Sequence, residues 1–405
     1  MRGLLKSAKF LMASFAFLST AGLIDGGVTA NAANNMSGGY GHSCAIKNDS
    51  VYCWGWNFYG QLGLGHNENA TGAKRVADLP GKALHVSTRK THTCAITTEG
   101  TYCWGKDTFE TLGIGERGHR NLPTKLNFPE GSQVTDISAG DIHTCAVVDG
   151  GVMCWGWNYS CALGKTSCAG GQPSTEDMEL SPRWVDGLPA GSGATKVVAT
   201  DSHTCAMVRG GLQCWGWNIY SKLGNTIDDM NYYPLPQWVR WMGENTKVTD
   251  VSAGENFTCA VQRGDLLCWG RPEHVGRGKG VYDSATPTVV PKLDRSQNPI
   301  LPSGNKTNTC TINKRNQVVC FGFNMMGQLA DPSFQSDLKA TVISGLPAGK
   351  TWVHTSVGSS HACARSSDDQ IWCWGYNAFC QLGDGRCDNG AGDARQPIPQ
   401  RTLGF

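Results

Sequence analysis

The stretch GHSCAIKNDSVYCWGWNFYGQLGLG, residues 41–65, is the first of seven related copies along the chain. Each copy has a first cysteine, a short polar turn, a second cysteine and, in most copies, a Gly-rich end. The first cysteines stand at positions 44, 94, 145, 205, 259, 310 and 363. A period near fifty residues is typical of one supersecondary unit repeated as an array. We therefore expect one body of seven units, although 405 residues could form two or three separate domains by length alone.

The third copy predicts the structure of one unit. Residues 142–148 (IHTCAVV) and 151–157 (GVMCWGW) alternate as strands do, and Asp149-Gly150 joins them. Asp-Gly between such runs is a strong signal for a two-residue hairpin, because both turn positions need a positive φ. Residues 132–140 supply a further strand before the hairpin, and residues 181–189 begin the next unit after a loop. Four short strands per repeat indicate a β-propeller blade. The predicted fold class is therefore all-β, a seven-bladed propeller of four-stranded blades.

The same hairpin predicts how the cysteines pair. Counting back from the turn places Cys145 opposite Cys154 in a non-hydrogen-bonded pair, whose Cα atoms lie about 4.5 Å apart, near the short end of the disulfide range. Free catalytic thiols would not need seven equivalent registers, and the Cys-x-x-Cys spacing of zinc sites is absent. Two copies also gain two extra cysteines together, which suggests loop disulfides. The predicted pairs are Cys44-Cys53, Cys94-Cys103, Cys145-Cys154, Cys161-Cys168, Cys205-Cys214, Cys259-Cys268, Cys310-Cys320, Cys363-Cys373 and Cys380-Cys387.

The N-terminus has the layout of a secretory signal peptide. Arg2, Lys6 and Lys9 precede an apolar core, and small residues offer cleavage after Ala21 or after Ala32. The apolar run, residues 10–24, is shorter than the roughly 20 residues that cross a bilayer. We expect residues 1–32 to be removed and residues 33–405 to form one propeller domain without a membrane span. An even number of cysteines fits export to an extracellular or periplasmic space.

The repeat as a whole resembles that of the regulator-of-chromosome-condensation family. The first copy matches it at His42, at Trp54-Gly55, at Asn57 and at residues 60–63 (GQLG), and the resemblance spans essentially the whole mature chain. The resemblance implies a seven-bladed propeller and, as in the nuclear family member, exchange of guanine nucleotide on a small GTPase. The cysteine pairs depart from the family, which commonly has an apolar and a small residue there, and they argue against a nuclear role.

The two chain ends suggest how the ring closes. Only residues 34–42 (NNMSGGYGH) precede the first hairpin, so this copy lacks an obvious leading strand. The chain ends in residues 396–405 (QPIPQRTLGF), which read as a strand with no hairpin after it. We therefore expect the C-terminal strand to join the N-terminal blade and close the ring.

The sequence offers no catalytic constellation. It lacks the Gly-x-Ser-x-Gly, His-Glu-x-x-His and phosphate-loop motifs, and residues 384–393 fail the calcium-loop pattern. Five histidines share one repeat position and could suggest a metal ring, but two copies replace them, so we interpret each as a hydrogen-bonding residue within its own blade: His42, His92, His143, His203 and His361. We expect no enzyme activity, no cofactor and no metal.

Function is expected where the copies differ. Aromatic residues follow the Trp-Gly-x-Asn motif in several copies, and the fourth copy adds a long loop with further aromatics. Equivalent loops of a propeller share one face, and Tyr and Trp are common anchors of protein interfaces; packing of blade ends is the alternative role. The candidate interface residues are Phe58, Tyr59, Phe109, Tyr159, Tyr220, Tyr232, Tyr233, Trp241 and Phe379.

The sequence therefore predicts a secreted, monomeric, non-enzymatic propeller that binds a protein partner. A regulator of a small GTPase and a structural envelope or matrix protein are the alternatives. A formal net charge of +2 gives no basic face for nucleic acid.

Overall fold

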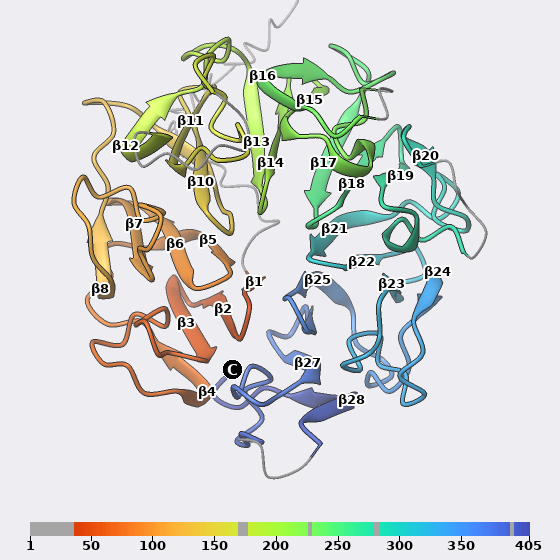
Figure 1. The fold of residues 1–405 in the computed structure, drawn as a ribbon. Coiled ribbons are helices and arrows are strands. Elements are labelled where there is room, and N and C mark those ends of the chain that lie inside the picture. The colour runs from red at the N-terminus through yellow and green to blue at the C-terminus, as the bar shows by residue number, and fades with distance from the viewer. Residues whose placement is uncertain (1–35, 169–176, 226–228, 279–283, 389–392) are drawn as a thin grey trace, which may run out of the picture.

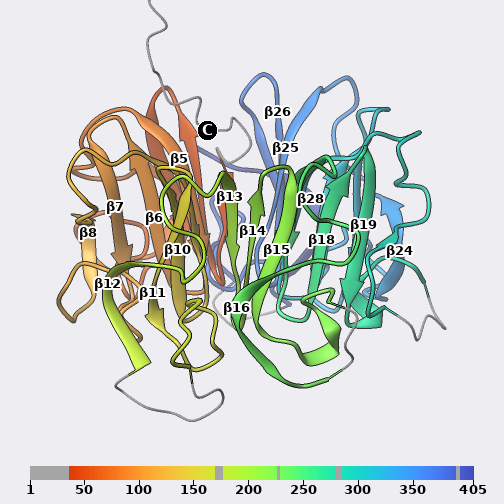
Figure 2. The same cartoon turned by 90° about the horizontal axis from the view of Figure 1, so that it is seen from above.

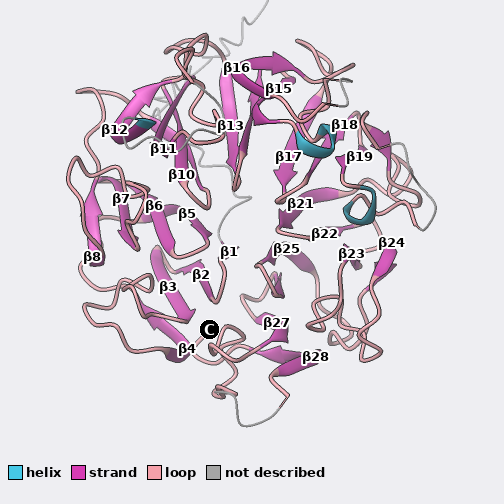
Figure 3. Ribbon diagram, viewed as in Figure 1, coloured by secondary structure: helices cyan, strands magenta, loops and turns pink. Residues whose placement is uncertain are grey.

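The computed structural model describes residues 36–168, 177–225, 229–278, 284–388 and 393–405. These residues form seven antiparallel four-stranded sheets arranged in a ring (Figure 1). Two single-turn helices lie wholly within this described part, η3 (Ile219–Ser221) and η4 (Pro272–His274), and both appear as short cyan segments in Figure 3. The predicted fold class is confirmed, whereas the expected signal peptide lies outside the described residues.

The strands run through each blade in chain order, from the central channel outward. They are, by blade, β1 (Met36–Gly38), β2 (His42–Lys47), β3 (Ser50–Gly55), β4 (Ala70–Arg75); β5 (Ala83–Arg89), β6 (His92–Thr97), β7 (Gly100–Gly105), β8 (Arg120–Lys125); β9 (Val134–Ala139), β10 (His143–Val148), β11 (Gly151–Trp157), β12 (Met178–Trp184); β13 (Ala194–Ala199), β14 (His203–Val208), β15 (Gly211–Trp217), β16 (Tyr232–Trp238); β17 (Val248–Ala253), β18 (Phe257–Gln262), β19 (Asp265–Gly270), β20 (Thr288–Val289); β21 (Ile300–Asn305), β22 (Asn308–Ile312), β23 (Val318–Gly322), β24 (Asp337–Val342); and β25 (Trp352–Val357), β26 (His361–Ser366), β27 (Ile371–Tyr376), β28 (Arg395–Arg401).

The central hairpin of each blade has the register expected from the sequence. In the third blade Cys145 lies opposite Cys154, and Val148 opposite Gly151. Asp149 and Gly150 have φ values of 47° and 71°, as the two-residue turn requires. The structure joins all nine of the proposed cysteine pairs, and in the seven hairpin pairs the Cα atoms are 4.1 Å apart.

Closure of the ring differs from the expectation. The C-terminal strand β28 pairs with β27 of its own blade, and the N-terminal blade is completed by its own β1. The short tail after β28 nevertheless reaches blade 1, where Ala73 N–H donates to Leu403 O (2.8 Å) and Phe405 packs against Tyr52 and Trp54. The expectation was wrong because β1 is only three residues long, too short to produce a recognisable pattern.

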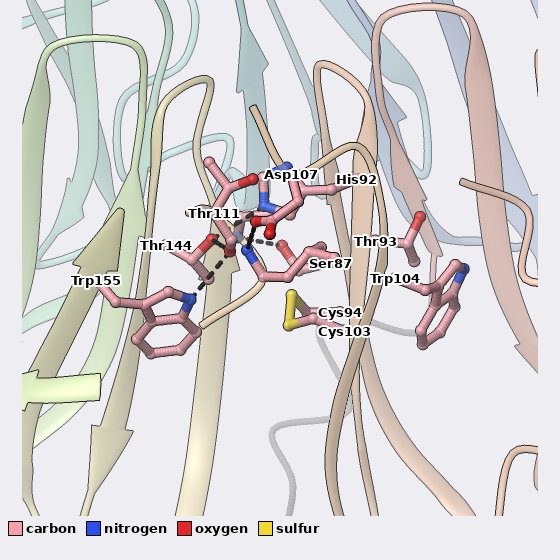
Figure 4. Close-up of a disulfide and its surroundings, with 12 residues drawn as sticks. Ser87, His92, Thr93, Cys94, Cys103, Trp104, Asp107, Thr111, Thr144 and Trp155 are labelled. Carbon is pink, nitrogen blue, oxygen red and sulfur yellow. Dashed lines mark hydrogen bonds between the residues drawn. A yellow bond between two sulfur atoms is a disulfide. The ribbon is translucent and has the colours of Figure 1, made fainter. Parts of the chain in front are cut away.

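Neighbouring blades are joined at a repeated seam. Figure 4 shows the seam between blades 2 and 3: the Trp155 indole N–H and the Thr144 hydroxyl both donate to Thr111 O, at 2.9 and 2.8 Å. The tryptophans at this repeat position are fully buried, and each indole donates to a loop carbonyl of the preceding blade: Trp54, Trp104, Trp155, Trp215, Trp269 and Trp374. This indole therefore packs between blades, as its position in the repeat suggests.

The repeated histidines also connect blades, which corrects the expectation that each serves its own blade. His92 Nε2 lies 2.9 Å from Thr144 Oγ1 of the next blade. Because that hydroxyl donates its proton to Thr111 O, the imidazole must be the donor. The same contact joins His42 to Thr93, His143 to Thr204 and His203 to Thr258, while His361 reaches Ser43 across the closure of the ring.

The propeller has two different faces (Figure 2). We call the lower one in that view the loop face; it carries the long connections between the third and fourth strands of each blade and the short ones between the first and second. The upper one, the turn face, carries the cysteine-hairpin turns and the connections from one blade to the next.

Candidate functional site

The long loops of the loop face are held by a buried asparagine. Asn57 follows the Trp-Gly-x motif, and its side-chain carbonyl accepts from Leu62 N–H at 2.9 Å. In five other blades a leucine N–H donates in the same way to an Asn or Asp side chain five residues earlier. The fifth blade is the exception, because Pro272 replaces the asparagine. Residues 58 and 59 and their equivalents lie between these two anchors. The aromatic side chains of the loop face are therefore presented on a braced backbone.

Six aromatic residues from blades 7 and 1 meet on this face, and we call them the aromatic patch: Tyr40, Trp56, Phe58, Tyr59, Tyr376 and Phe379. Trp56 is at the centre, with its ring centroid 5.2 Å from Phe379, 5.6 Å from Tyr59 and 6.1 Å from Tyr40. Phe58 is 63% exposed and Tyr40 39% exposed, although large apolar groups usually lie inside a protein. The aromatic patch is thus a contiguous, partly exposed surface that spans the closure of the ring.

Smaller aromatic groups continue around the loop face. Phe109 of blade 2 stacks on Trp157 of blade 3 at 4.9 Å, and Trp157 contacts Tyr159 at 5.0 Å. In blade 4, Trp217 stacks on Tyr232 at 5.9 Å. Tyr220, which is 42% exposed, lies under the guanidinium of Arg271. In blade 6 the position equivalent to Phe58 holds Met325, which is 66% exposed.

The structure separates the predicted interface residues into three groups. Phe58, Tyr59 and Phe379 belong to the aromatic patch, while the residues of blades 2 to 4 on the same face form the smaller groups: Phe109, Tyr159, Tyr220 and Tyr232. Tyr233 is the second residue of strand β16, and its hydroxyl donates to Asp229 at 2.9 Å. Trp241 is 59% exposed, but it follows β16 in the connection to blade 5 and therefore lies on the turn face.

Sequence reasoning missed the residue inside the Trp-Gly-x-Asn motif itself. Trp56, Trp157, Trp217 and Tyr376 occupy this position; the three tryptophans make the central ring contacts of their groups, and Tyr376 contacts Phe379 at 6.3 Å. The signal was present in the recurring Cys-Trp-Gly-Trp-Asn string. It is easily overlooked because this aromatic residue lies inside the repeated motif, between the glycine and the asparagine, whereas the copies differ most after the asparagine.

Cations border the aromatic groups. Lys106 Nζ lies 4.5 Å from the ring centre of Tyr59, and Lys306 Nζ lies 5.9 Å from that of Tyr40. Near the channel mouth on the same face, Asp141, Asp201 and Glu255 come from consecutive blades. Burial, reinforced by Asp201, raises the pKa of Glu255 above its usual value. The loop face therefore combines aromatic surface with charges of both signs.

The central channel offers little room. Arg89 extends from β5 and donates to Asp141 and to Ala253 O of blade 5, each at 3.3 Å. The remaining cavity has a volume of about 110 Å³, small compared with ordinary ligand pockets. Among the described residues, no group of three His, Cys, Asp or Glu side chains could hold a metal ion. No helix in this described part of the chain is long and apolar enough to span a membrane.

Several repeats of this chain match the models of a known repeat family. Residues 48–96, 100–147 and 209–261 match the family described as Regulator of chromosome condensation (RCC1) repeat, and residues 352–381 match a second form of it. The chain is similar to the ultraviolet-B receptor UVR8 of Arabidopsis thaliana, with 28% identity over 271 residues, 66% of this chain and 58% of the receptor. The chain therefore spans less than two thirds of that relative's length.

Two solved structures share the fold. Human WBSCR16 superposes with a TM-score of 0.74 at 18% identity, covering 88% of this chain and 94% of that one. Prp20p of Saccharomyces cerevisiae, studied for its binding to Gsp1p and histones, gives a TM-score of 0.71 at 18% identity and covers 89% of this chain and 87% of its own. These likenesses concern the architecture alone.

Proposed function

Because this chain is a seven-bladed propeller of RCC1 repeats, we propose that it is a secreted, non-enzymatic module that binds a protein partner through the aromatic patch of its loop face. The observation that carries the proposal is the exposure of Phe58 and Tyr40 within a contiguous aromatic cluster on a braced loop. Aromatic residues are enriched at interface centres, and a few of them commonly supply most of the binding energy.

Three further features support this proposal. Repeat propellers present broad surfaces, and relatives such as Prp20p have been studied for protein binding. Nine disulfides and a signal-like N-terminus favour an oxidising compartment, where such bonds persist. The cations Lys106 and Lys306 beside the patch favour a partner surface that is apolar at its centre and acidic at its rim.

The proposal is tested by affinity capture with the oxidised mature chain and two single variants. Phe58→Ala removes the most exposed ring of the patch, and Trp241→Ala removes a comparably exposed ring from the turn face. Truncating an anchor residue commonly costs more than 1 kcal/mol, about a fivefold to tenfold loss of affinity. We expect a stoichiometric partner that binds the wild type and Trp241→Ala equally and Phe58→Ala at least about fivefold more weakly.

The alternatives give different results in the same experiment. A captured small GTPase that releases its nucleotide faster in the presence of the chain would support an exchange factor. Absence of any stoichiometric partner, or a partner lost only with Trp241→Ala, would contradict binding through the aromatic patch. Absence of any stoichiometric partner would favour a structural envelope or matrix role.

A further inference from the structure

In six of the seven blades, an apolar plug follows the fourth strand on the turn face. The residue just after the fourth strand donates its N–H to the third strand of the same blade, as Val185 does to Val152 O at 2.9 Å. Three positions later an apolar side chain folds under the connection. Leu188 is 3% exposed, Met242 is fully buried and Leu293 is 1% exposed. The plug residues are Leu79, Leu188, Met242, Leu293, Leu346 and Phe405.

The plug also supplies a hydrogen-bond acceptor in three blades. Val152 N–H donates to Leu188 O at 2.9 Å, Leu212 N–H to Met242 O at 2.8 Å, and Leu266 N–H to Leu293 O at 3.0 Å. One leucine-like residue therefore fills an apolar site with its side chain and satisfies a buried strand N–H with its carbonyl.

Blade 2 lacks this plug. Its fourth strand ends normally, with Leu126 N–H donating to Thr101 O at 2.9 Å, but the residue three positions later is Pro129, which is exposed. Phe128 instead turns toward blade 3 and contacts the Trp155 ring at 6.1 Å. A cavity of about 640 Å³ opens at this place, within the size range of ligand pockets. We call it the blade 2 socket; its apolar walls include Leu84, Ile96, Leu126, Phe128 and Val134.

Two polar groups of the blade 2 socket differ from those of blades 3 to 5: a strand N–H that lacks the plug carbonyl, and a side-chain hydroxyl with no partner among the described residues. Thr101 is equivalent to Val152, yet no backbone hydrogen bond joins its N–H to residues 126–133 of the connection. Ser132 Oγ is buried at the socket wall and makes no hydrogen bond within the described residues. Buried polar groups are normally satisfied, and leaving one unpaired is costly. The socket thus has the apolar walls and the free donor that a plug residue would use.

We propose that the blade 2 socket binds the leucine side chain of a Gly-Leu-Pro turn in a partner protein, whose leucine carbonyl accepts from Thr101 N–H. The occupant is indicated by the chain's own plugs, since Gly-Leu-Pro-Ala-Gly fills the equivalent place in blades 3 and 6 at residues 187–191 and 345–349. The socket lies on the turn face, away from the aromatic patch. This inference therefore does not depend on the proposed function.

The test uses the peptide acetyl-Gly-Leu-Pro-Ala-Gly-amide and the folded, oxidised mature chain. Titration calorimetry is expected to give one site, and the Thr101 amide signal in a nitrogen-15 spectrum is expected to shift on binding. The same peptide with alanine in place of leucine should bind at least about tenfold more weakly, because the socket is then left partly empty.

Two matched variants separate the socket from other surfaces. Pro129→Leu places an apolar side chain where the other blades have their plug, and it should abolish peptide binding. Pro189→Leu makes the same change in blade 3, whose site Leu188 already fills, and binding should be unaffected. No binding to the wild type at millimolar peptide, or binding that leaves the Thr101 amide unmoved, would overturn the proposal whether or not Pro129→Leu folds.

Discussion

Two seams of the ring solve the same packing problem with different chemistry. Between blades 2 and 3, His92, Thr144 and Trp155 form a buried hydrogen-bonded group that ends on Thr111 O. Between blades 5 and 6, Phe257 replaces the histidine and Phe321 the tryptophan, and both are fully buried in an apolar cluster that includes Val275. The two hydrogen bonds that Thr144 and Trp155 donate to a loop carbonyl therefore have no equivalent among the described residues of this seam.

The difference shows which part of the repeat is indispensable. A large ring fills the seam in both cases, whereas the polar network is present in one and absent in the other. Buried hydrogen bonds contribute modestly when complete but cost much when broken. We therefore expect the stability of the polar seams to depend on pH and on single substitutions of their polar side chains. The stability of the apolar seam should depend only on the volume of its buried side chains.

The largest expected effect is that of pH on the polar seams. Burial lowers the pKa of His42 and His143 to about 3 and of His92 and His361 to about 4, and it lowers the pKa of His203 well below its usual value. These side chains are neutral when folded, but they take up a proton below about pH 6.5 when unfolded. Stability is therefore complete above pH 6.5 and is lost as the pH falls toward 4.

The size of the loss follows from proton uptake. Each histidine contributes about 1.4 kcal/mol per pH unit to the change in unfolding free energy within this window. Burial raises the pKa of Asp107 to about 6 and of Asp136 to about 7, and these two carboxyls oppose the trend. Denaturant unfolding at pH 7 and at pH 5 should show a loss of several kcal/mol at pH 5. Equal stability at both values would contradict neutral buried histidines.

Loss of seam volume should have the next largest effect, and a similar one at both seams. Trp155→Ala and Phe321→Ala each empty a fully buried ring site, which commonly costs about 3–5 kcal/mol. Denaturant unfolding of the two variants measures this cost. A much smaller loss for Phe321→Ala would mean that the apolar seam is not the structural equivalent of the polar one.

The smallest expected difference between the two seams is the effect of removing one threonine hydroxyl from each. Thr144→Val removes the acceptor of His92 and a donor to Thr111 O, and leaving the buried imidazole unpaired should cost about 1–3 kcal/mol. Thr309→Val is the matched change at the apolar seam, where the hydroxyl has, among the described residues, a single weak polar contact of 3.9 Å with Cys259 Sγ. We expect a cost below about 1 kcal/mol there. Equal costs in thermal or denaturant unfolding would contradict the comparison.

The fold was predictable from the sequence because its signals are local and repeated seven times. The Asp149-Gly150 turn determines the register of its hairpin, and the register places Cys145 opposite Cys154. The link from His92 to Thr144 was not predictable in the same way, since it joins residues 52 positions apart on different blades. Adjacent copies do carry a clue, because Asn308 replaces the histidine where the next copy has Ala362 in place of threonine.

The candidate site was predictable only in part. Phe58, Tyr59 and Phe379 were identified from their common repeat position, and they gather because equivalent loops share a face. Tyr40 joins them from a different connection, and only the three-dimensional arrangement shows this. Trp241 was grouped with the long fourth loop, whereas strand β16 carries the chain to the opposite face before that residue.

Hydrogen exchange on the captured complex will show whether the aromatic patch is the binding surface. Partner binding should slow amide exchange in residues 56–61 and 376–381, which come from the two blades that form the patch, relative to the free chain. Slowed exchange confined to the hairpin turns and blade connections of the turn face, with residues 56–61 unchanged, would contradict it.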